Sequence, residues 1–287
     1  MGILMPEARE QFLMLGGLRF HVREWGAASS PPLILLHGLA SSSHMFDLIA
    51  PELAVDYHVI APDQRGHGLS DKPDHGYDFE SVAHDLDRLF DAYKLDQAAV
   101  FGHSWGAYTT LYYAATRPAR VSRAGLIDGG IRVFSEIFPT WAEAETKMAP
   151  PEYIHRSVDD IQHMIEFEWL GAAFRPELMP LALSIFDISN PHEVHAHLSR
   201  ANHMQIAYPL WDIRPVDFFA RVRCPMLIIN AVAPGETADA QIQALTRNAL
   251  EANPQAEVVW MPDTIHDIPW QRPRELVRFM KQFLGEK

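Results

Sequence analysis

The feature that most constrains this chain is a serine set between two glycines, where a strand pattern gives way to a helix pattern. The apolar, β-type run Ala98–Phe101 leads into Gly102-His103-Ser104-Trp105-Gly106, and a helical run, Trp105–Thr116, leaves it. The turn is so tight that glycine is needed where the strand and helix backbones approach each other. It raises the Ser104 hydroxyl above the first turn of a helix, where free N–H groups favour a developing negative charge. The pattern therefore predicts a nucleophilic serine.

Strand and helix patterns alternate along most of the chain, after a predicted N-terminal hairpin of Gln11–Leu15 and Leu18–Glu24. Further apolar runs are typical of strands buried on both faces: Leu33–Leu36, Tyr57–Ala61, Ala124–Ile127, Met226–Asn230 and Val258–Met261. Helical patterns lie between or after them: His44–Leu53, Tyr77–Tyr93, Asp239–Ala252 and Pro273–Leu284. This alternation predicts an α/β protein with a mainly parallel, doubly wound sheet, whose chemistry gathers at the carboxyl ends of the strands.

The alternation stops between Ile131 and Pro215, where helical stretches and frequent prolines replace buried strands. We interpret residues 131–215 as a helical cap inserted into a core formed by residues 1–130 and 216–287. Most of the large apolar side chains of the cap are expected to form its own core, and a minority to face the cleft. Those facing residues favour a mostly apolar or aromatic substrate of modest size.

Composition limits the partners of the chain. The formal net charge of −13 argues against nucleic acid and disfavours anionic membranes. The single cysteine, Cys224, excludes an internal disulfide and fits a reducing compartment. No long apolar stretch marks a signal peptide or a membrane span, so we expect a cytoplasmic protein. A small-molecule substrate is the expected partner, and a homodimer is left open.

Four motifs together resemble the α/β-hydrolase family: His37-Gly38, the turn Asp63–Ser70, the segment Gly102–Gly106 and a late histidine, His266. The resemblance covers nearly the whole chain. It implies a mostly parallel eight-stranded sheet with helices on both faces, and a serine–acid–histidine triad in that chain order. His266 follows the last predicted strand, where the family places its general base, whereas His103 is expected to be a packing residue.

The acid of the triad is less directly indicated. The family usually takes it from the loop after the strand that is Met226–Asn230 here, but Ala233 stands where an aspartate commonly falls. Some members take the acid from the end of the preceding core strand, which in this chain is Asp128. We expect Asp128 to be the acid, with Glu236 as the alternative and Asp239 after it. Asp63 is expected to be structural, bonding the backbone of its own turn.

The resemblance also implies a mechanism. His266 takes the proton of Ser104 as the hydroxyl attacks a carbonyl group, and Asp128 orients the imidazole. The backbone N–H groups of Leu39 and Trp105 form the oxyanion hole. The expected function is a serine hydrolase that cleaves a carboxyl ester or lactone through an acyl-enzyme.

Three other functions of the same fold stay open: a carbon–carbon bond hydrolase, a cofactor-free dioxygenase and a non-catalytic ligand receptor. Epoxide hydrolases and haloalkane dehalogenases are disfavoured, because they carry aspartate at the position of Ser104. Neither a cofactor nor a metal is expected. A group of cap histidines lacks the cysteines or paired carboxylates of a metal site: His192, His195, His197 and His203.

Overall fold

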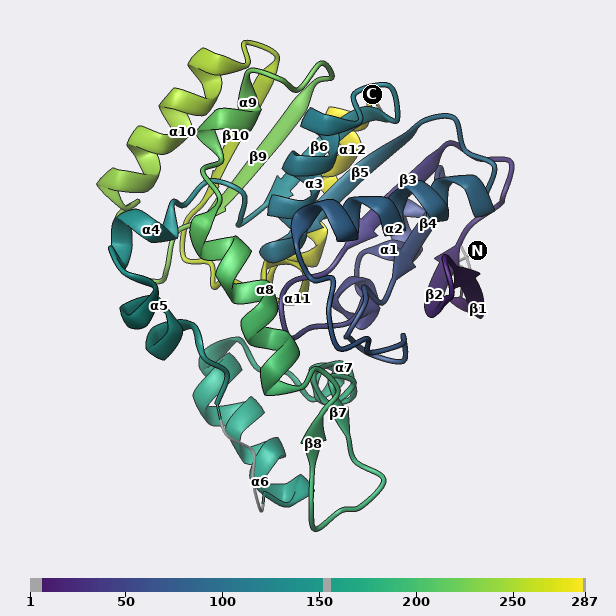
Figure 1. Cartoon of the computed structure of the whole chain (residues 1–287), viewed down its shortest axis with the longest axis vertical. Coiled ribbons are helices and arrows are strands. Elements are labelled where there is room, and N and C mark those ends of the chain that lie inside the picture. Colours follow the sequence, from purple (N-terminus) through teal and green to yellow (C-terminus); the bar gives the residue numbers. More distant parts are fainter. Residues whose placement is uncertain (1–6, 152–155, 286–287) are drawn as a thin grey trace.

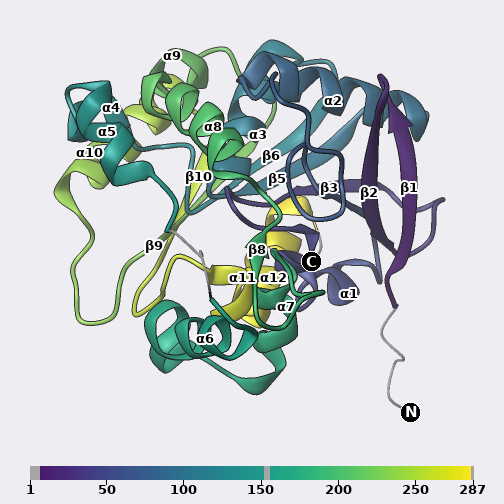
Figure 2. The ribbon, with the colours of Figure 1, turned by 60° about the horizontal axis from the view of Figure 1, so that its bottom comes forward.

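The computed structural model describes residues 7–151 and 156–285, and a twisted sheet of eight strands forms its centre (Figure 1). In spatial order the strands are β1 (Arg9–Leu15), β2 (Leu18–Trp25), β4 (His58–Pro62), β3 (Pro32–Leu36), β5 (Ala98–His103), β6 (Val121–Ile127), β9 (Met226–Ala231) and β10 (Ala256–Met261). The pairs β1–β2 and β2–β4 are antiparallel, and the pairs from β4 to β10 are parallel. The predicted hairpin and the mostly parallel sheet are confirmed. Figure 2 shows β1 and β2 at the opposite edge of the sheet from β9 and β10.

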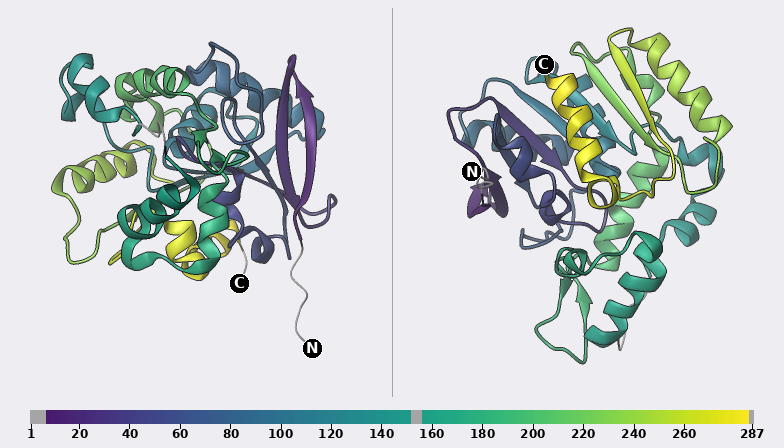
Figure 3. Two further views of the ribbon diagram at one scale, coloured as in Figure 1. Left: turned by 90° about the horizontal axis from the view of Figure 1, so that it is seen from below. Right: turned by 180° about the vertical axis from the view of Figure 1, so that it is seen from behind.

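Helices cover both faces of the sheet, and the side chains of β3 show how the two faces divide. Leu33 and Leu35 lie in one apolar cluster, while Ile34 and Leu36 lie in another. Successive side chains of a strand point to opposite faces, so a continuous apolar run is buried on both. The core helices are η1 (Ser43–Phe46), α1 (Ala50–Leu53), α2 (Phe79–Ala92), α3 (Trp105–Thr116), α9 (Val216–Phe219), α10 (Ala240–Ala252), α11 (Ile268–Gln271) and α12 (Pro273–Leu284). Helices α1 and α12 pack on the first face, and α2, α3 and α10 on the second (Figure 3).

Two predicted helices, α3 and α12, begin and end at the predicted residues. The single helix predicted over 44–53 is wrong, because the structure divides it into η1 and α1. Pro51 lies in the first turn of α1. Proline lacks the N–H that a helix interior needs, so it favours a new helix start over a continuous helix. No helix in the described part of the chain is long and apolar enough to cross a bilayer.

The segment after β6 contains mainly short helical elements, which occupy the lower and left parts of Figure 1. They are α4 (Phe134–Ile137), α5 (Trp141–Met148), α6 (Val158–His163), η2 (Met164–Leu170), η3 (Gly171–Ala173), η4 (Pro176–Leu178), α7 (Met179–Leu183), the strands β7 (Phe186–Asp187) and β8 (His195–Ala196), and α8 (Arg200–Asp212). The β7–β8 hairpin and the π-helical turns of η2 were not predicted. Ile161, Leu170 and Phe186 belong to the apolar cluster that contains Leu33. Part of the segment therefore extends the main core, while Trp141, Tyr208 and Trp211 pack on one another within the segment.

Candidate active site

Ser104 occupies the turn between β5 and α3, with backbone angles of φ 55° and ψ −119°. Its N–H donates to the Ile127 carbonyl at 2.9 Å, which ties the turn to β6. A Cβ atom on Gly102 would lie 1.9 Å from the Gly106 carbonyl oxygen, and one on Gly106 would lie 2.1 Å from the Leu36 carbonyl oxygen. These approaches leave no room for a side chain. Both glycines are required where the sequence predicts close backbone contact.

Asp128 follows the end of β6 and is held at three points. Its N–H donates to the Ile229 carbonyl at 2.7 Å, and its Oδ1 accepts the Ala231 N–H at 2.9 Å. Its Oδ2 lies 2.5 Å from Nδ1 of His266. The carboxylate therefore joins the end of β9 to the histidine that follows β10.

The position of Asp128 sets the protonation of His266. Desolvation lowers the pKa of the imidazole, but the hydrogen bond and the charge of Asp128 outweigh it, so the pKa of His266 is raised above its usual value. With the Nδ1 proton directed at Asp128, Nε2 is left to accept a proton. The side chain keeps 53% of its surface exposed because it faces a pocket.

The structure brings Ser104 and His266 to the same two pockets, of about 430 Å³ and about 290 Å³. Asp128 lines the larger one. The structure contains no hydrogen bond between the Ser104 hydroxyl and the His266 ring. Such catalytic hydrogen bonds are often long in a free enzyme and shorten when substrate is bound.

Neither of the other two predicted acids forms a hydrogen bond or an ion pair with His266. Glu236 lines the larger pocket in the loop after β9. The Asp239 carboxylate caps α10, accepting the N–H groups of Gln241 and Ile242. Of the three candidates, Asp128 alone pairs with the histidine.

The two predicted oxyanion-hole residues lie on either side of Ser104. Trp105 is the first residue of α3, so its N–H is one of those without a partner in the helix. Leu39 follows β3 and lines the smaller pocket beside Ser104. A Cβ atom on Gly38 would lie 2.9 Å from the Ser104 Cβ, which shows how closely this loop approaches the nucleophile.

His67 connects Trp105 to Ala40, the residue after Leu39, a role that the sequence did not indicate. Its ring stacks on Trp105 with a centroid distance of 5.5 Å, and its Nε2 accepts the Ala40 N–H at 3.2 Å. Ala40 has a left-handed φ of 53°, so the loop needs such a restraint. Burial, with the nearby charge of His37, holds the pKa of His67 well below its usual value. The ring is therefore neutral and able to accept this hydrogen bond.

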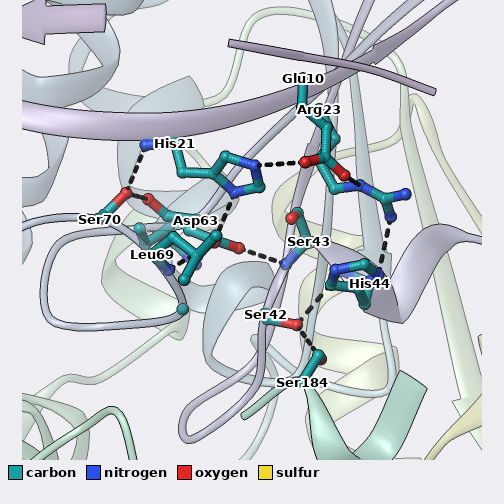
Figure 4. A network of polar contacts seen from close by, with 12 residues as sticks. Glu10, His21, Arg23, Ser42, Ser43, His44, Asp63, Leu69, Ser70 and Ser184 are labelled. Atoms are coloured by element: carbon teal, nitrogen blue, oxygen red, sulfur yellow. Dashed lines mark hydrogen bonds and ion pairs between the residues drawn. The ribbon is translucent and has the colours of Figure 1, made fainter. Parts of the chain in front are cut away.

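A buried polar network around Asp63 holds Ser43, at the end of the loop that contains Leu39 and Ala40 (Figure 4). Asp63 contacts His21 Nδ1 at 2.9 Å and accepts the N–H groups of Ser43 at 2.7 Å and Leu69 at 2.9 Å. Burial alone would raise the pKa of Asp63, but these hydrogen bonds and nearby positive charge hold it well below its usual range. The expected structural role of Asp63 is supported: Leu69 lies in its own turn, and Ser43 is a second backbone partner outside that turn.

Two further contacts position the loop that carries His266. His103 Nε2 donates to the His266 carbonyl at 2.9 Å. Burial, with the charge of His266, lowers the pKa of His103 to about 4, so this ring is neutral near pH 7. From the cap, Trp169 Nε1 donates to Asp267 at 2.8 Å. The signal in the sequence for His103 was its place beside Ser104, but no sequence pattern marks the contact between Trp169 and Asp267.

The two pockets differ in chemistry. The smaller one is lined by apolar side chains that include Met45, Met164, Trp169 and Ile185. The larger one carries charged and polar side chains and includes Arg132, which sequence reasoning missed. The feature of the sequence that could have indicated Arg132 is its position four residues after Asp128. Within residues 7–151 and 156–285, no three His, Cys, Asp or Glu side chains form a group that could hold a metal ion.

These features define a class of α/β protein, in which a serine at a strand–helix turn faces a histidine paired with an aspartate from the neighbouring strand. A family model described as the alpha/beta hydrolase fold matches residues 31–212. This chain belongs to that family of hydrolases.

Individual relatives match part of the sequence or the fold. The soluble epoxide hydrolase of Corynebacterium sp. (strain C12) is 37% identical over 115 residues, which are 40% of this chain and 40% of that protein. The match thus spans less than half of this curated relative. The structure of E-2-(acetamidomethylene)succinate hydrolase aligns with a TM-score of 0.83 and 23% identity, over 97% of this chain and 99% of that one. The structure of the enol-lactonase of Burkholderia xenovorans LB400 aligns with a TM-score of 0.74 and 20% identity, over 96% of this chain and 100% of that one. At these identities the structural likenesses show the fold alone.

Proposed function

We propose that this chain is a serine hydrolase that cleaves a carboxyl ester or lactone of a small, mostly apolar or aromatic substrate. The observation that carries the proposal is the pairing of Asp128 with His266 in a pocket that Ser104 also lines. The three residues have the chemistry of a nucleophile, a base and an orienting acid, in the chain order of the family.

In the proposed reaction, His266 Nε2 accepts the proton of the Ser104 hydroxyl as the oxygen attacks the substrate carbonyl. The Leu39 and Trp105 N–H groups stabilise the resulting oxyanion. The carbon–oxygen bond to the leaving group breaks, and the leaving oxygen takes the proton from His266. Water then attacks the acyl-serine with His266 again as the base, which releases the acid and restores Ser104.

The identity of the nucleophile supports an acyl substrate over an epoxide. A carboxylate nucleophile that opens an epoxide forms an ester, which water can cleave at its carbonyl group. Ser104 would form an ether instead, and an ether has no carbonyl carbon for water to attack. The enol-lactonase of Burkholderia xenovorans LB400 shares the fold, and hydrolysis of a lactone is the kind of reaction that a serine nucleophile supports.

The test is the turnover of para-nitrophenyl esters of graded chain length, aryl esters and lactones by the wild type, Ser104→Ala and Ser189→Ala. Ser189 is an exposed serine of the cap and provides the matched control. We expect ester or lactone turnover and fluorophosphonate labelling in the wild type and Ser189→Ala, and neither in Ser104→Ala. Labelling without turnover of any ester or lactone would favour the carbon–carbon bond hydrolase. The absence of both in the wild type would overturn the proposal and favour a dioxygenase or a receptor.

A further inference from the structure

Arg132 is the second residue of the segment 131–215, and it lines the larger pocket together with Ser104 and His266. It is the only lysine or arginine among the described residues that line either pocket. No salt bridge or side-chain hydrogen bond joins its guanidinium to another described residue. The side chain is exposed, so its charge is available to a molecule in the pocket.

The backbone around Arg132 is fixed relative to the nucleophile. The Tyr108 hydroxyl donates to the Arg132 carbonyl at 3.0 Å, and Tyr108 lies one turn of α3 after Ser104. The charge of Arg132 also reaches the site. Desolvation lowers the pKa of His266 and Asp128 raises it, and Arg132 adds a smaller lowering effect. Because Arg132 lines the same pocket as Ser104 and His266, a small substrate bound there can contact all three residues.

The acidic groups of this pocket do not neutralise Arg132 through contact. Asp128 is occupied by His266 and the Ala231 N–H. Asp239 is occupied as the cap of α10. Glu236 lies in the loop after β9 and forms no ion pair with Arg132. An arginine left without a carboxylate partner is well suited to bind one, since its planar guanidinium matches the two carboxylate oxygens.

We infer that the substrate carries one carboxylate on the part that occupies the larger pocket, and that Arg132 binds this carboxylate. The inference rests on the proposed function, and it names the substrate class of that site. The apolar part of the substrate then occupies the smaller pocket, beside Met45 and Trp169. A phosphate with two negative charges fits less well, because Glu236 and the net charge of −13 oppose it.

The experiment uses two matched pairs of esters. In the first pair, the para-nitrophenyl esters of adipic and adipamic acid differ by a carboxylate against a neutral amide on the acyl side. In the second, para-carboxyphenyl and para-carbamoylphenyl butyrate differ in the same way on the leaving group. The readout is the ratio of kcat/KM for the charged ester to that for the neutral ester, with the Ser104→Ala rate subtracted.

We expect the wild type to favour the charged ester in at least one pair. In that pair Arg132→Gln lowers the ratio about tenfold or more, because a charge-assisted bidentate contact is lost. Arg132→Lys keeps the charge but loses the bidentate geometry, so its ratio lies between those of the wild type and Arg132→Gln. Arg247→Gln is the control, since Arg247 is an exposed residue of α10 outside both pockets, and it leaves the ratio unchanged. Equal ratios in Arg132→Gln and the wild type, or no preference for either charged ester, overturn the inference.

A binding measurement separates this inference from the proposed function. If no ester is cleaved by a Ser104-dependent route, the proposed function fails, and the thermal midpoint of Ser104→Ala with adipate or adipamide then decides the inference. A larger rise with adipate, lost when Arg132→Gln is added, supports it. Equal effects of adipate and adipamide overturn it.

Discussion

Asp128 Oδ2 lies 2.5 Å from His266 Nδ1, although 138 positions separate the two residues in the chain. The proposed acid follows the end of β6, beside the strand that leads to Ser104, and β9 supplies only the backbone N–H of its last residue, Ala231, to hold the carboxylate. The proposed nucleophile and acid therefore follow two neighbouring strands, whose paired residues His103 and Ile127 end in register.

The first prediction concerns the proposed acid. Asp128→Asn should lower kcat for an ester by about a thousandfold or more, because the amide no longer fixes the imidazole tautomer or stabilises its charge. The measurement is steady-state turnover under saturating substrate, with far-ultraviolet circular dichroism to show that the variant is folded.

The matched control is Glu236→Gln, which removes one carboxylate from the same pocket. Glu236 forms no hydrogen bond or ion pair with His266. Its effect on a neutral ester should be several-fold at most. A larger loss in Glu236→Gln than in Asp128→Asn would move the acid to the loop after β9.

The second prediction is a pH dependence. His266 must be neutral to act as a base, and its pKa is raised above the usual value of about 6.5. The rate of fluorophosphonate labelling of Ser104 should therefore rise with pH, with a midpoint above 6.5. In Asp128→Asn the main contribution that raises the pKa is gone while desolvation remains, so the midpoint should move to lower pH. An unchanged or higher midpoint would contradict the pairing.

The third prediction concerns stability. Asp63→Asn breaks a buried pair with His21, and we expect the free energy of unfolding at pH 7 to fall by about 3 kcal/mol. Because the pKa of Asp63 is lower in the folded state, its stabilising effect is present above the unfolded pKa of about 3.9 and is lost as the pH falls through the folded value.

Urea unfolding at several pH values tests this. The difference in the free energy of unfolding between the wild type and Asp63→Asn should narrow as the pH falls below about 4. The control is Asp91→Asn, which breaks an exposed pair with Arg120 and should cost about 1 kcal/mol or less. If the difference between the wild type and Asp63→Asn widened in acid, the stabilising role of the ionised Asp63 would be refuted.

The fourth prediction concerns His67. His67→Phe keeps a ring to stack on Trp105 but removes the acceptor of the Ala40 N–H. The loop that presents Leu39 should then be less well held, so kcat should fall about tenfold while KM changes little, because an oxyanion contact acts mainly in the transition state. The exposed His84 provides the control, His84→Phe. An effect on KM alone would argue against this role.

The core of the fold could be predicted because its signals are local. The change from a strand pattern to a helix pattern at Ser104 lies within a few residues, and α3 begins and ends where that pattern predicts. Asp128 could be selected because the loop after β9 lacks an aspartate at the usual place. The helix predicted over 44–53 failed because an apolar pattern does not show where Pro51 divides it.

The contacts made by residues 131–215 could not be predicted, because they depend on chain segments that meet only in the folded molecule. Trp169 and Asp267 are 98 positions apart, and no periodicity links them. The same holds for His67 and Ala40. That Arg132 pairs with no carboxylate of the described residues is visible only in the folded structure.

The loop after β9 lines the larger pocket while the proposed acid stands elsewhere. Residues 233–238 can therefore change in length and sequence without moving the proposed acid. The N–H that holds the Asp128 carboxylate belongs to Ala231, the last residue of β9, and so lies outside this loop. This separation makes the loop a tolerant region for directed evolution, in which new substrate preferences can be selected while the reaction chemistry is inherited intact.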